Sequence, residues 1–168
     1  MKGVIFNSLN EYVEENFGLN FWEELLEKVQ PLSKGIYTAG GYYQDQEIFD
    51  FVGQISQEKN IAVPDLLESF GCYLFSKLAD KYPLFIRPEM NLLSFLQTID
   101  KVIHVEVKKL HPNASLPEME YQILAPNKIT IYYRSSRKMC FLAIGLIRGA
   151  SDRFNEVISI NHPICMHQ

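Results

Sequence analysis

Cysteine is scarce in this sequence, and long hydrophobic runs and low-complexity segments are absent. The three cysteines, Cys72, Cys140 and Cys165, cannot all be paired in disulfides, which favours a reducing, cytoplasmic setting. No apolar run approaches the roughly 20 residues of a membrane-spanning helix. The short apolar patch at the amino terminus is broken by Asn7, Ser8 and Asn10, so it is a poor signal peptide.

Positive charge is not in excess either. The chain has 16 lysines and arginines against 20 acidic residues, and its net charge of −4 argues against nucleic acid as the main partner. It also lacks a glycine-rich phosphate loop and any recognisable cyclase, kinase or other catalytic cassette. Its 168 residues predict a single domain with a sizeable apolar core.

The hydrophobic pattern changes character along the chain. Apolar residues at helical spacing predict helices over about residues 2–17, 22–29, 48–55, 64–78 and 92–110. After Pro112 the pattern predicts short strands at 121–124 and 128–133, a helix over about 138–154 and a final strand at 157–161. We therefore expect an α+β fold, with a mainly helical amino-terminal part and a small antiparallel sheet with one inserted helix.

The segment between Pro88 and Pro112 contains no other proline and no glycine, and it carries a histidine at a notable position. Its apolar residues recur at steps of three and four and form one stripe: Leu92, Leu96, Ile99, Ile103, Val107 and Leu110. His104 falls on the flank of this stripe, half-buried and fixed in direction by the helix. A lone histidine there is more often a hydrogen-bonded core residue than a ligand, so its neighbours must decide between the two.

Three polar residues follow at alternate positions of a β-branched and aromatic run. Strand alternation predicts that Tyr133, Ser135 and Arg137 lie on one face. They offer a phenol, a hydroxyl and a bidentate guanidinium, which together suit carboxylate or phosphate groups. A histidine combined with a separate anion-binding group is suited to a carboxylate-bearing haem. The alternative is a strand end that is hydrogen-bonded to loops.

The sequence resembles the H-NOX (haem nitric oxide/oxygen binding) domains, the bacterial relatives of the haem-binding region of soluble guanylate cyclase. The resemblance covers essentially the whole chain, from the opening Met1-Lys2-Gly3-Val4-Ile5-Phe6-Asn7 through His104, Pro117 and Tyr133-x-Ser135-x-Arg137 to Gly145-Leu146-Ile147-x-Gly149. It implies a haem buried between a distal helical part, about residues 1–60, and a proximal part, about 61–168. In the family the sheet has four strands, and the fourth follows a segment beyond the end of this chain, so we expect the carboxy-terminal strand to be missing.

The resemblance also implies roles for individual residues. His104 becomes the axial ligand of the iron of haem b (iron protoporphyrin IX), and Tyr133, Ser135 and Arg137 become the propionate-binding residues, with Asp45 facing the motif arginine. Pro117 becomes the residue that presses on the porphyrin and distorts it, although from the residues alone it is an ordinary turn proline.

Six aliphatic residues match positions that line the distal pocket in the family: Ile5, Leu9, Leu74, Leu78, Leu142 and Leu146. Members that bind dioxygen place a tyrosine five residues after the motif arginine, and here that position is Leu142. Leu9 and Leu74 stand where such members use polar partners for that tyrosine. All six are equally well explained as core, and both roles are compatible.

A second constellation consists of Cys140, His162 and Cys165. Some bacterial H-NOX domains bind structural zinc with these residue types and a further cysteine nearer the carboxyl terminus, which this chain lacks. His167 is the remaining candidate for the fourth ligand. Cys72 has no partner at metal-binding spacing and is expected in the core, and His111 in a loop.

The resemblance implies a gas sensor rather than an enzyme. We expect the protein to bind nitric oxide and carbon monoxide, but not dioxygen, at ferrous haem, and to regulate a separate histidine kinase or a diguanylate cyclase or phosphodiesterase protein. One alternative is a haem-dependent enzyme such as a peroxidase, which would need a distal histidine or arginine. Another is a haem-free interaction domain.

Overall fold

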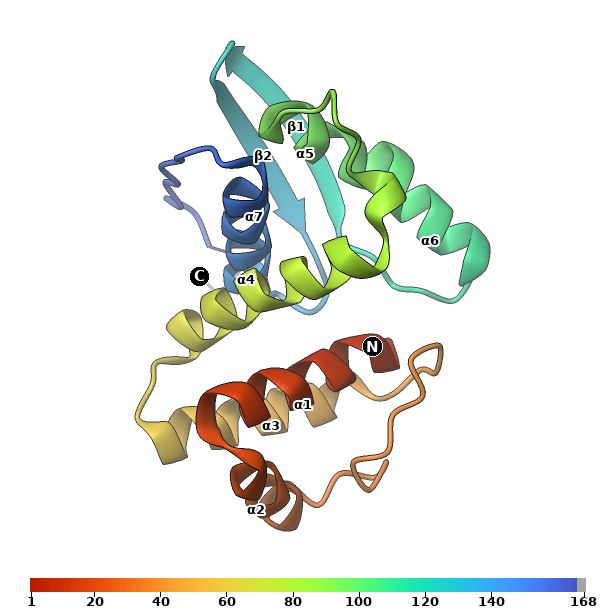
Figure 1. Ribbon diagram of the computed structural model, residues 1–168, viewed down its shortest axis with the longest axis vertical. Helices are drawn as coiled ribbons and strands as arrows, with labels where there is room; N and C mark the ends of the chain where they lie inside the picture. The colour runs from red at the N-terminus through yellow and green to blue at the C-terminus, as the bar shows by residue number, and fades with distance from the viewer. Residues whose placement is uncertain (166–168) are drawn as a thin grey trace.

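The computed structural model describes residues 1–165 of the chain. Four helices make up its first half: α1 (Gly3–Phe17), α2 (Leu19–Val29), α3 (Asp45–Lys59) and α4 (Val63–Lys81). Helices α1, α2 and α3 lie together at one end of the molecule, and the long α4 crosses its middle (Figure 1). Helix α4 begins at Val63-Pro64, where a proline has no intrahelical bond to lose.

The second half contains shorter elements and the sheet. They are η1 (Pro83–Phe85), α5 (Leu92–Thr98), η2 (Ile99–Ile103), α6 (His104–Leu110), β1 (Glu118–Ala125), β2 (Lys128–Arg134) and α7 (Cys140–Phe154). Strands β1 and β2 form an antiparallel hairpin in which Tyr121 is opposite Ile131. Helices α5 and α7 pack against each other, with the rings of Phe95 and Phe154 in contact, and the hairpin rises beside them (Figure 1). The predicted α+β class, with helices first and a small antiparallel sheet after them, is confirmed.

The helical segment predicted over residues 92–110 is present, but it is not α-helical throughout. A π-helical turn, η2, separates α5 from α6, so that His104 is the first residue of α6. Hydrophobic spacing at steps of three and four does not distinguish a π turn from an α turn, because both keep the stripe on one side. Segments of π-helix occur frequently at functional sites.

The prediction of a final strand at residues 157–161 was wrong. Residues 156–165 have no regular secondary structure, although Ile158 packs against the apolar core. A strand needs a neighbouring strand to pair its backbone groups. Within residues 1–165 the sheet contains β1 and β2 alone, and the β-branched residues of this segment have no ladder to join.

Two apolar clusters meet at α4 and α7. The larger one fills the space among α1, α2, α3 and α4, with fully buried members such as Phe6, Phe51 and Phe70. The smaller one joins the end of α4 to α5 and α7 through Phe75, Phe95 and Ala150, among others. Leu146 of α7 packs against both clusters, so it lies where the helical half meets the half that carries the sheet.

Glycines allow α4 and α7 to approach closely. A Cβ atom on Gly71 would lie 2.5 Å from the carbonyl oxygen of Leu142 and 2.8 Å from the Cα of Gly145. A Cβ atom on Gly145 would meet the backbone of Glu68 and would lie 2.8 Å from the Cα of Gly71. Because the obstructing atoms belong to backbone, they cannot move aside as a flexible side chain could. The contact therefore requires glycine on both helices.

We expect Gly145→Ala to destabilise the protein by roughly 1–3 kcal/mol, because the added methyl group forces α4 and α7 apart. Gly53→Ala is the matched control, since Gly53 lies inside α3 and a Cβ there would meet nothing within 4 Å. That variant should gain up to about 1 kcal/mol from improved helix propensity. Denaturant unfolding of both variants measures the two effects, and a neutral or stabilising Gly145→Ala would contradict the close-contact argument.

Candidate functional site

His104 stands at the junction of η2 and α6 with its side chain 17% exposed. Its Nδ1 lies 3.3 Å from Oδ1 of Asp100, four residues earlier on the same helical segment. No residue of η2 or α6 is fully buried by the protein itself. The apolar side chains of Ile99 and Ile103 are partly buried against the smaller cluster. The imidazole is therefore largely shielded from solvent, and it follows a helical turn whose isoleucines pack against the smaller cluster.

The motif residues do not form a continuous strand face as the alternation predicted. Strand β2 ends at Arg134, so Ser135 and Arg137 belong to the connection to α7. There the backbone N–H of Arg137 donates to Oγ of Ser135 at 3.2 Å, and Lys138 has a left-handed backbone with φ of 52°. The alternating burial nevertheless continues, because Tyr133, Ser135 and Arg137 are all half-buried while the residues between them are exposed.

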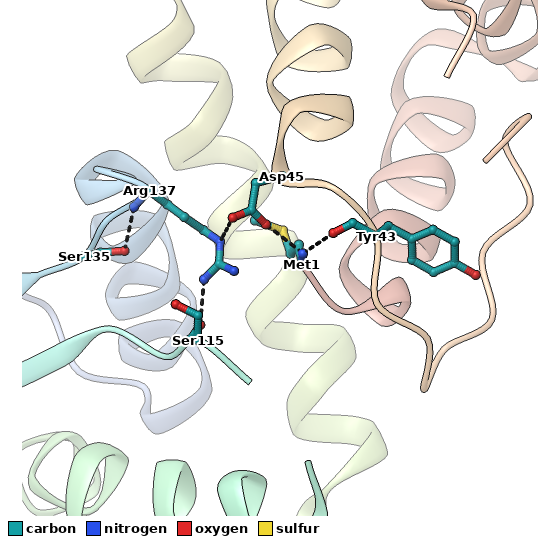
Figure 2. Close-up of polar contacts among 6 residues, drawn as sticks. All are labelled: Met1, Tyr43, Asp45, Ser115, Ser135 and Arg137. Atoms are coloured by element: carbon teal, nitrogen blue, oxygen red, sulfur yellow. Dashed lines mark hydrogen bonds and ion pairs between the residues drawn. The ribbon is translucent and has the colours of Figure 1, made fainter. Parts of the chain in front are cut away.

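Arg137 connects the two halves of the molecule (Figure 2). Its Nε donates to Oδ2 of Asp45, at the start of α3, at 2.7 Å. Its Nη1 donates to the backbone carbonyl of Ser115, in the loop before β1, at 2.6 Å. The other carboxylate oxygen of Asp45 accepts a hydrogen bond from the Met1 ammonium at 2.7 Å. The expected contact between Asp45 and Arg137 is thus present, and it orients the guanidinium.

The charges around Asp45 change its acidity. Burial alone would raise the pKa of this carboxyl group, but hydrogen bonds from the Met1 ammonium and from Arg137 outweigh it and hold the pKa below its usual range. A lowered folded-state pKa means that the ionised pair stabilises the protein at neutral pH. This contribution is complete above the unfolded-state pKa of about 3.9 and is lost as the pH falls through the folded-state value.

We expect Asp45→Asn to lower the free energy of unfolding at pH 7 by about 1 kcal/mol, the upper end for a partly exposed ion pair. The difference from the unmodified protein should shrink as the pH falls below about 4. Asp50→Asn is the control, because Asp50 is an exposed carboxylate of the same helix that accepts from Gln46. Unfolding curves across pH measure the effect, and a difference that persists unchanged in acid would contradict the ionic origin.

Tyr133 and Pro117 are half-buried near the hairpin. Burial raises the pKa of the Tyr133 phenol, and a hydrogen bond with Ser135 opposes that rise. Pro117 lies in the loop between α6 and β1, immediately before the first strand. Tyr133, Ser135 and Arg137 therefore present a phenol, a hydroxyl and a partly engaged guanidinium in one stretch of chain, which is a donor set that carboxylates bind well.

The six aliphatic positions come from three helices. Leu9 of α1, Leu74 of α4 and Leu142 of α7 are buried in the larger cluster. Ile5, Leu78 and Leu146, from the same three helices, are half-buried and pack against it. None of these six side chains carries a hydrogen-bond donor. These six residues, here called the aliphatic wall, belong to or pack against the larger apolar cluster.

The cysteine and histidine candidates of the second constellation do come together. The sulfur atoms of Cys140 and Cys165 are 3.3 Å apart, and these atoms and a ring nitrogen of His162 all lie within 4.8 Å of one another. Burial and the second thiol raise the pKa of Cys140 to about 11. Two sulfurs and one imidazole are typical zinc ligands, and a closed tetrahedral site would need one more. His167 lies outside the described residues.

Two other candidates have ordinary surroundings. His111 follows the last residue of α6, and its Nδ1 lies 3.2 Å from the ammonium of Lys2. Cys72 is half-buried on α4, and burial raises the pKa of its thiol.

Two neighbours of the candidate site residues, Asp100 and the Met1 ammonium, were not predicted from the sequence. A carboxylate four residues before His104 on one helix was a visible signal for the first. The second depends on the tertiary fold, which brings the amino terminus to α3.

The family of the chain follows from comparison with known proteins. The family model described as Haem-NO-binding matches residues 2–162, so the chain belongs to the Haem-NO-binding, or H-NOX, family of haem-binding gas-sensor domains. Domains of this family are sensors rather than enzymes. Soluble guanylate cyclase 89Db of Drosophila melanogaster is 26% identical over 141 residues, which are 82% of this chain and 20% of that protein. The chain thus spans about a fifth of the length of such relatives.

Solved structures agree with this assignment. An H-NOX protein from S. oneidensis in the Fe(II)NO ligation state is 38% identical, with a TM-score of 0.93 over 99% of this chain and 92% of that one. An Fe(II) unliganded H-NOX protein from K. algicida is 32% identical, with a TM-score of 0.86 over 92% of this chain and 84% of that one. An H-NOX domain from Shewanella oneidensis has also been solved in the Fe(II)CO ligation state, with 38% identity, a TM-score of 0.89 and coverage of 99% and 92%.

No helix within residues 1–165 is both long and apolar enough to cross a membrane.

Proposed function

We propose that this chain is a sensor of nitric oxide and carbon monoxide that binds haem b between its two halves and regulates a separate signalling protein. The observation that carries the proposal is that a half-buried His104 and a half-buried Arg137 guanidinium are both present in a chain of the Haem-NO-binding family. The two groups supply what a haem needs from a protein, an iron ligand and a partner for its carboxylates.

The donor set fits haem. His104 offers a ring nitrogen to the iron, and its half-buried apolar neighbours suit a porphyrin face. Arg137, Tyr133 and Ser135 would hold the propionates, and Pro117 would contact the porphyrin and distort it. Arg137 is directed by Asp45 and Ser115, so little of its freedom is lost when it binds a carboxylate. When bound, the haem iron supplies a site for diatomic gases.

The aliphatic wall supports selection among those gases. A bound dioxygen molecule accumulates negative charge and gains from a hydrogen-bond donor, whereas nitric oxide and carbon monoxide need one far less. The wall offers no donor at Leu9, Leu74 or Leu142. The S. oneidensis neighbours have been solved with nitric oxide and carbon monoxide on iron, which supports the same two ligands here.

The two alternatives predict different chemistry. A peroxidase would need a distal histidine or arginine to assist cleavage of peroxide, and the six wall positions are aliphatic. The family also consists of sensor domains. A haem-free interaction domain would explain the fold without explaining why a half-buried His104 and the Tyr133-x-Ser135-x-Arg137 segment occur together.

We further propose that the partner is a histidine kinase or a diguanylate cyclase or phosphodiesterase protein, in a cytoplasmic setting. In the guanylate cyclase relatives the matching region is a fifth of a longer protein. In those relatives the matching region and the rest of the protein are covalently joined. A partner on a separate chain would instead receive the gas signal through a protein–protein interface.

Cys140, His162 and Cys165 would hold a zinc ion. We expect metal analysis of the purified protein to find about one zinc per chain. Cys140→Ser should lose that zinc, because a hydroxyl is a poor replacement for a thiolate ligand. Cys72→Ser is the control and should retain it, because Cys72 lies outside the cluster. Zinc retained by Cys140→Ser, or lost by both variants, would contradict the assignment.

Anaerobic titration tests the proposed function. The haem-loaded, reduced protein should bind nitric oxide and carbon monoxide in a ratio of one gas molecule per haem, each with a distinct change in the haem absorption spectrum. A chain that retains no haem, or a haem spectrum that neither gas changes, would overturn the proposal.

A further inference from the structure

Asp100 has the geometry of a residue that acts on His104. The carboxylate lies one helical turn before the imidazole, and their closest atoms are Oδ1 and Nδ1 at 3.3 Å. The π-helical turn η2 carries Asp100, and His104 follows directly after it, so the two side chains project from one rigid piece of helix. The side chain of Asp100 is 41% exposed, against 17% for His104. The carboxylate is therefore partly exposed to solvent, whereas the imidazole that it contacts is mostly buried.

The chemistry of the pair determines which ring nitrogen carries the proton. An ionised carboxylate can only accept hydrogen bonds, so Nδ1 of a neutral His104 must be the donor. The lone pair then lies on Nε2, the nitrogen that points away from Asp100. A neutral imidazole with its free lone pair in a fixed direction is the form that binds a metal.

The negative charge of Asp100 also affects a half-buried residue of the neighbouring strand. On β1, the half-buried Tyr121 has its pKa raised first by burial and then by the negative charge of Asp100. Tyr121 packs against the same apolar cluster as Ile103, the residue before His104. Asp100 therefore acts on a semi-apolar region, where a charge is screened less than in water.

We propose that Asp100 is a positioning residue for His104, which fixes the imidazole tautomer and strengthens Nε2 as a donor to haem iron. The inference rests on the proposed function, since it requires His104 to be the axial ligand. A carboxylate partner draws the Nδ1 proton toward itself and gives the ring more anionic character. A more anionic ligand favours ferric over ferrous iron and makes the bond between His104 and iron stronger. Asp100 would thereby set how firmly His104 holds the iron.

Two substitutions of Asp100 test this role. Asp100→Asn keeps the shape and a weaker, neutral acceptor, whereas Asp100→Ala removes the acceptor altogether. We expect both variants to fold and to bind haem, because the side chain is largely at the surface. The iron–histidine stretching frequency of the ferrous protein should fall in the order unmodified protein, Asn, Ala. The reduction potential should rise in the same order, and haem should dissociate about tenfold faster from the Ala variant.

Glu106→Gln is the matched control. Glu106 is two residues from His104, its side chain is 43% exposed, and its carboxylate pairs with Lys109 at 2.6 Å. The Glu106→Gln substitution removes the same charge from the same helical segment and leaves the contact between Asp100 and His104 unchanged. It should leave the stretching frequency and the potential unchanged.

The outcomes separate three cases. The graded shift in the Asp100 variants, with none in Glu106→Gln, supports the proposal. No shift in the Asp100 variants, or an equal shift in Glu106→Gln, overturns it, the second because a long-range charge effect would then suffice. An unmodified protein without an iron–histidine band would instead refute the proposed function on which the inference rests.

Discussion

Replacement of His104 by glycine is expected to abolish stable haem binding. The variant removes the one histidine on the helical segment from Leu92 to Leu110, and a neutral imidazole is a common ligand of haem iron. We expect haem to dissociate at least tenfold faster, a loss of about 1.4 kcal/mol or more. Free imidazole should partly restore the bound haem, because it can occupy the space left by the ring. The absorbance of protein-bound haem, with and without imidazole, measures both effects.

His111→Gly is the control for this experiment. His111 lies on the same stretch of chain but contacts Lys2 instead of the apolar cluster. It should retain a normal haem spectrum. A normal spectrum of His104→Gly without imidazole would mean that another residue is the ligand, and the account of the site would fail.

The second large effect concerns dioxygen. We expect the reduced protein in air to show no stable dioxygen complex, although it binds carbon monoxide and nitric oxide. A hydrogen bond to a charged acceptor is worth roughly 1.5–3 kcal/mol, which corresponds to a tenfold to more than hundredfold change in affinity. Leu142, Leu74 and Leu9 supply no such bond, so this stabilisation is absent. Absorption spectra of the reduced protein under argon, carbon monoxide and air measure the selectivity.

Leu142→Tyr alone should not create a stable dioxygen complex. The new phenol would stand among buried aliphatic side chains, with no partner at Leu9 or Leu74 to orient its hydroxyl. An unpaired buried hydroxyl is costly, so the side chain would turn away from the wall or destabilise the fold. A stable dioxygen spectrum of the unmodified protein would reveal a donor outside the six positions and would contradict the selectivity argument.

The helices were predictable because each one has a clear apolar stripe and a clear end. Helix α4, for example, follows from Pro64 at its start and from the spacing of Leu67, Phe70 and Leu74. The π-helical turn before His104 was not predictable, because it leaves the stripe intact. The prediction of a strand at residues 157–161 failed for a different reason. Its residues have strand propensity, but strand formation depends on a partner edge that local sequence does not describe.

The site was predicted in parts. Spacing indicated His104 and the Tyr133-x-Ser135-x-Arg137 segment, and the family resemblance linked them to haem. The ion pair between Asp45 and Arg137 joins residues 92 positions apart, so it could be expected only from the resemblance. The Met1 ammonium completes that network through a long-range contact that no local pattern encodes. Roles of the individual residues in haem binding stay predictions that the variants above test.

The resonance Raman spectrum of the ferrous, gas-free protein tests the central claim most directly, since it reports on the bond between His104 and iron. We expect an iron–histidine stretching band in the unmodified protein that shifts when the iron isotope is changed. In His104→Gly supplied with imidazole, the band should move to a different frequency, because the ligand is no longer attached to the chain. A band that is identical in the two proteins would show that His104 is not the axial ligand.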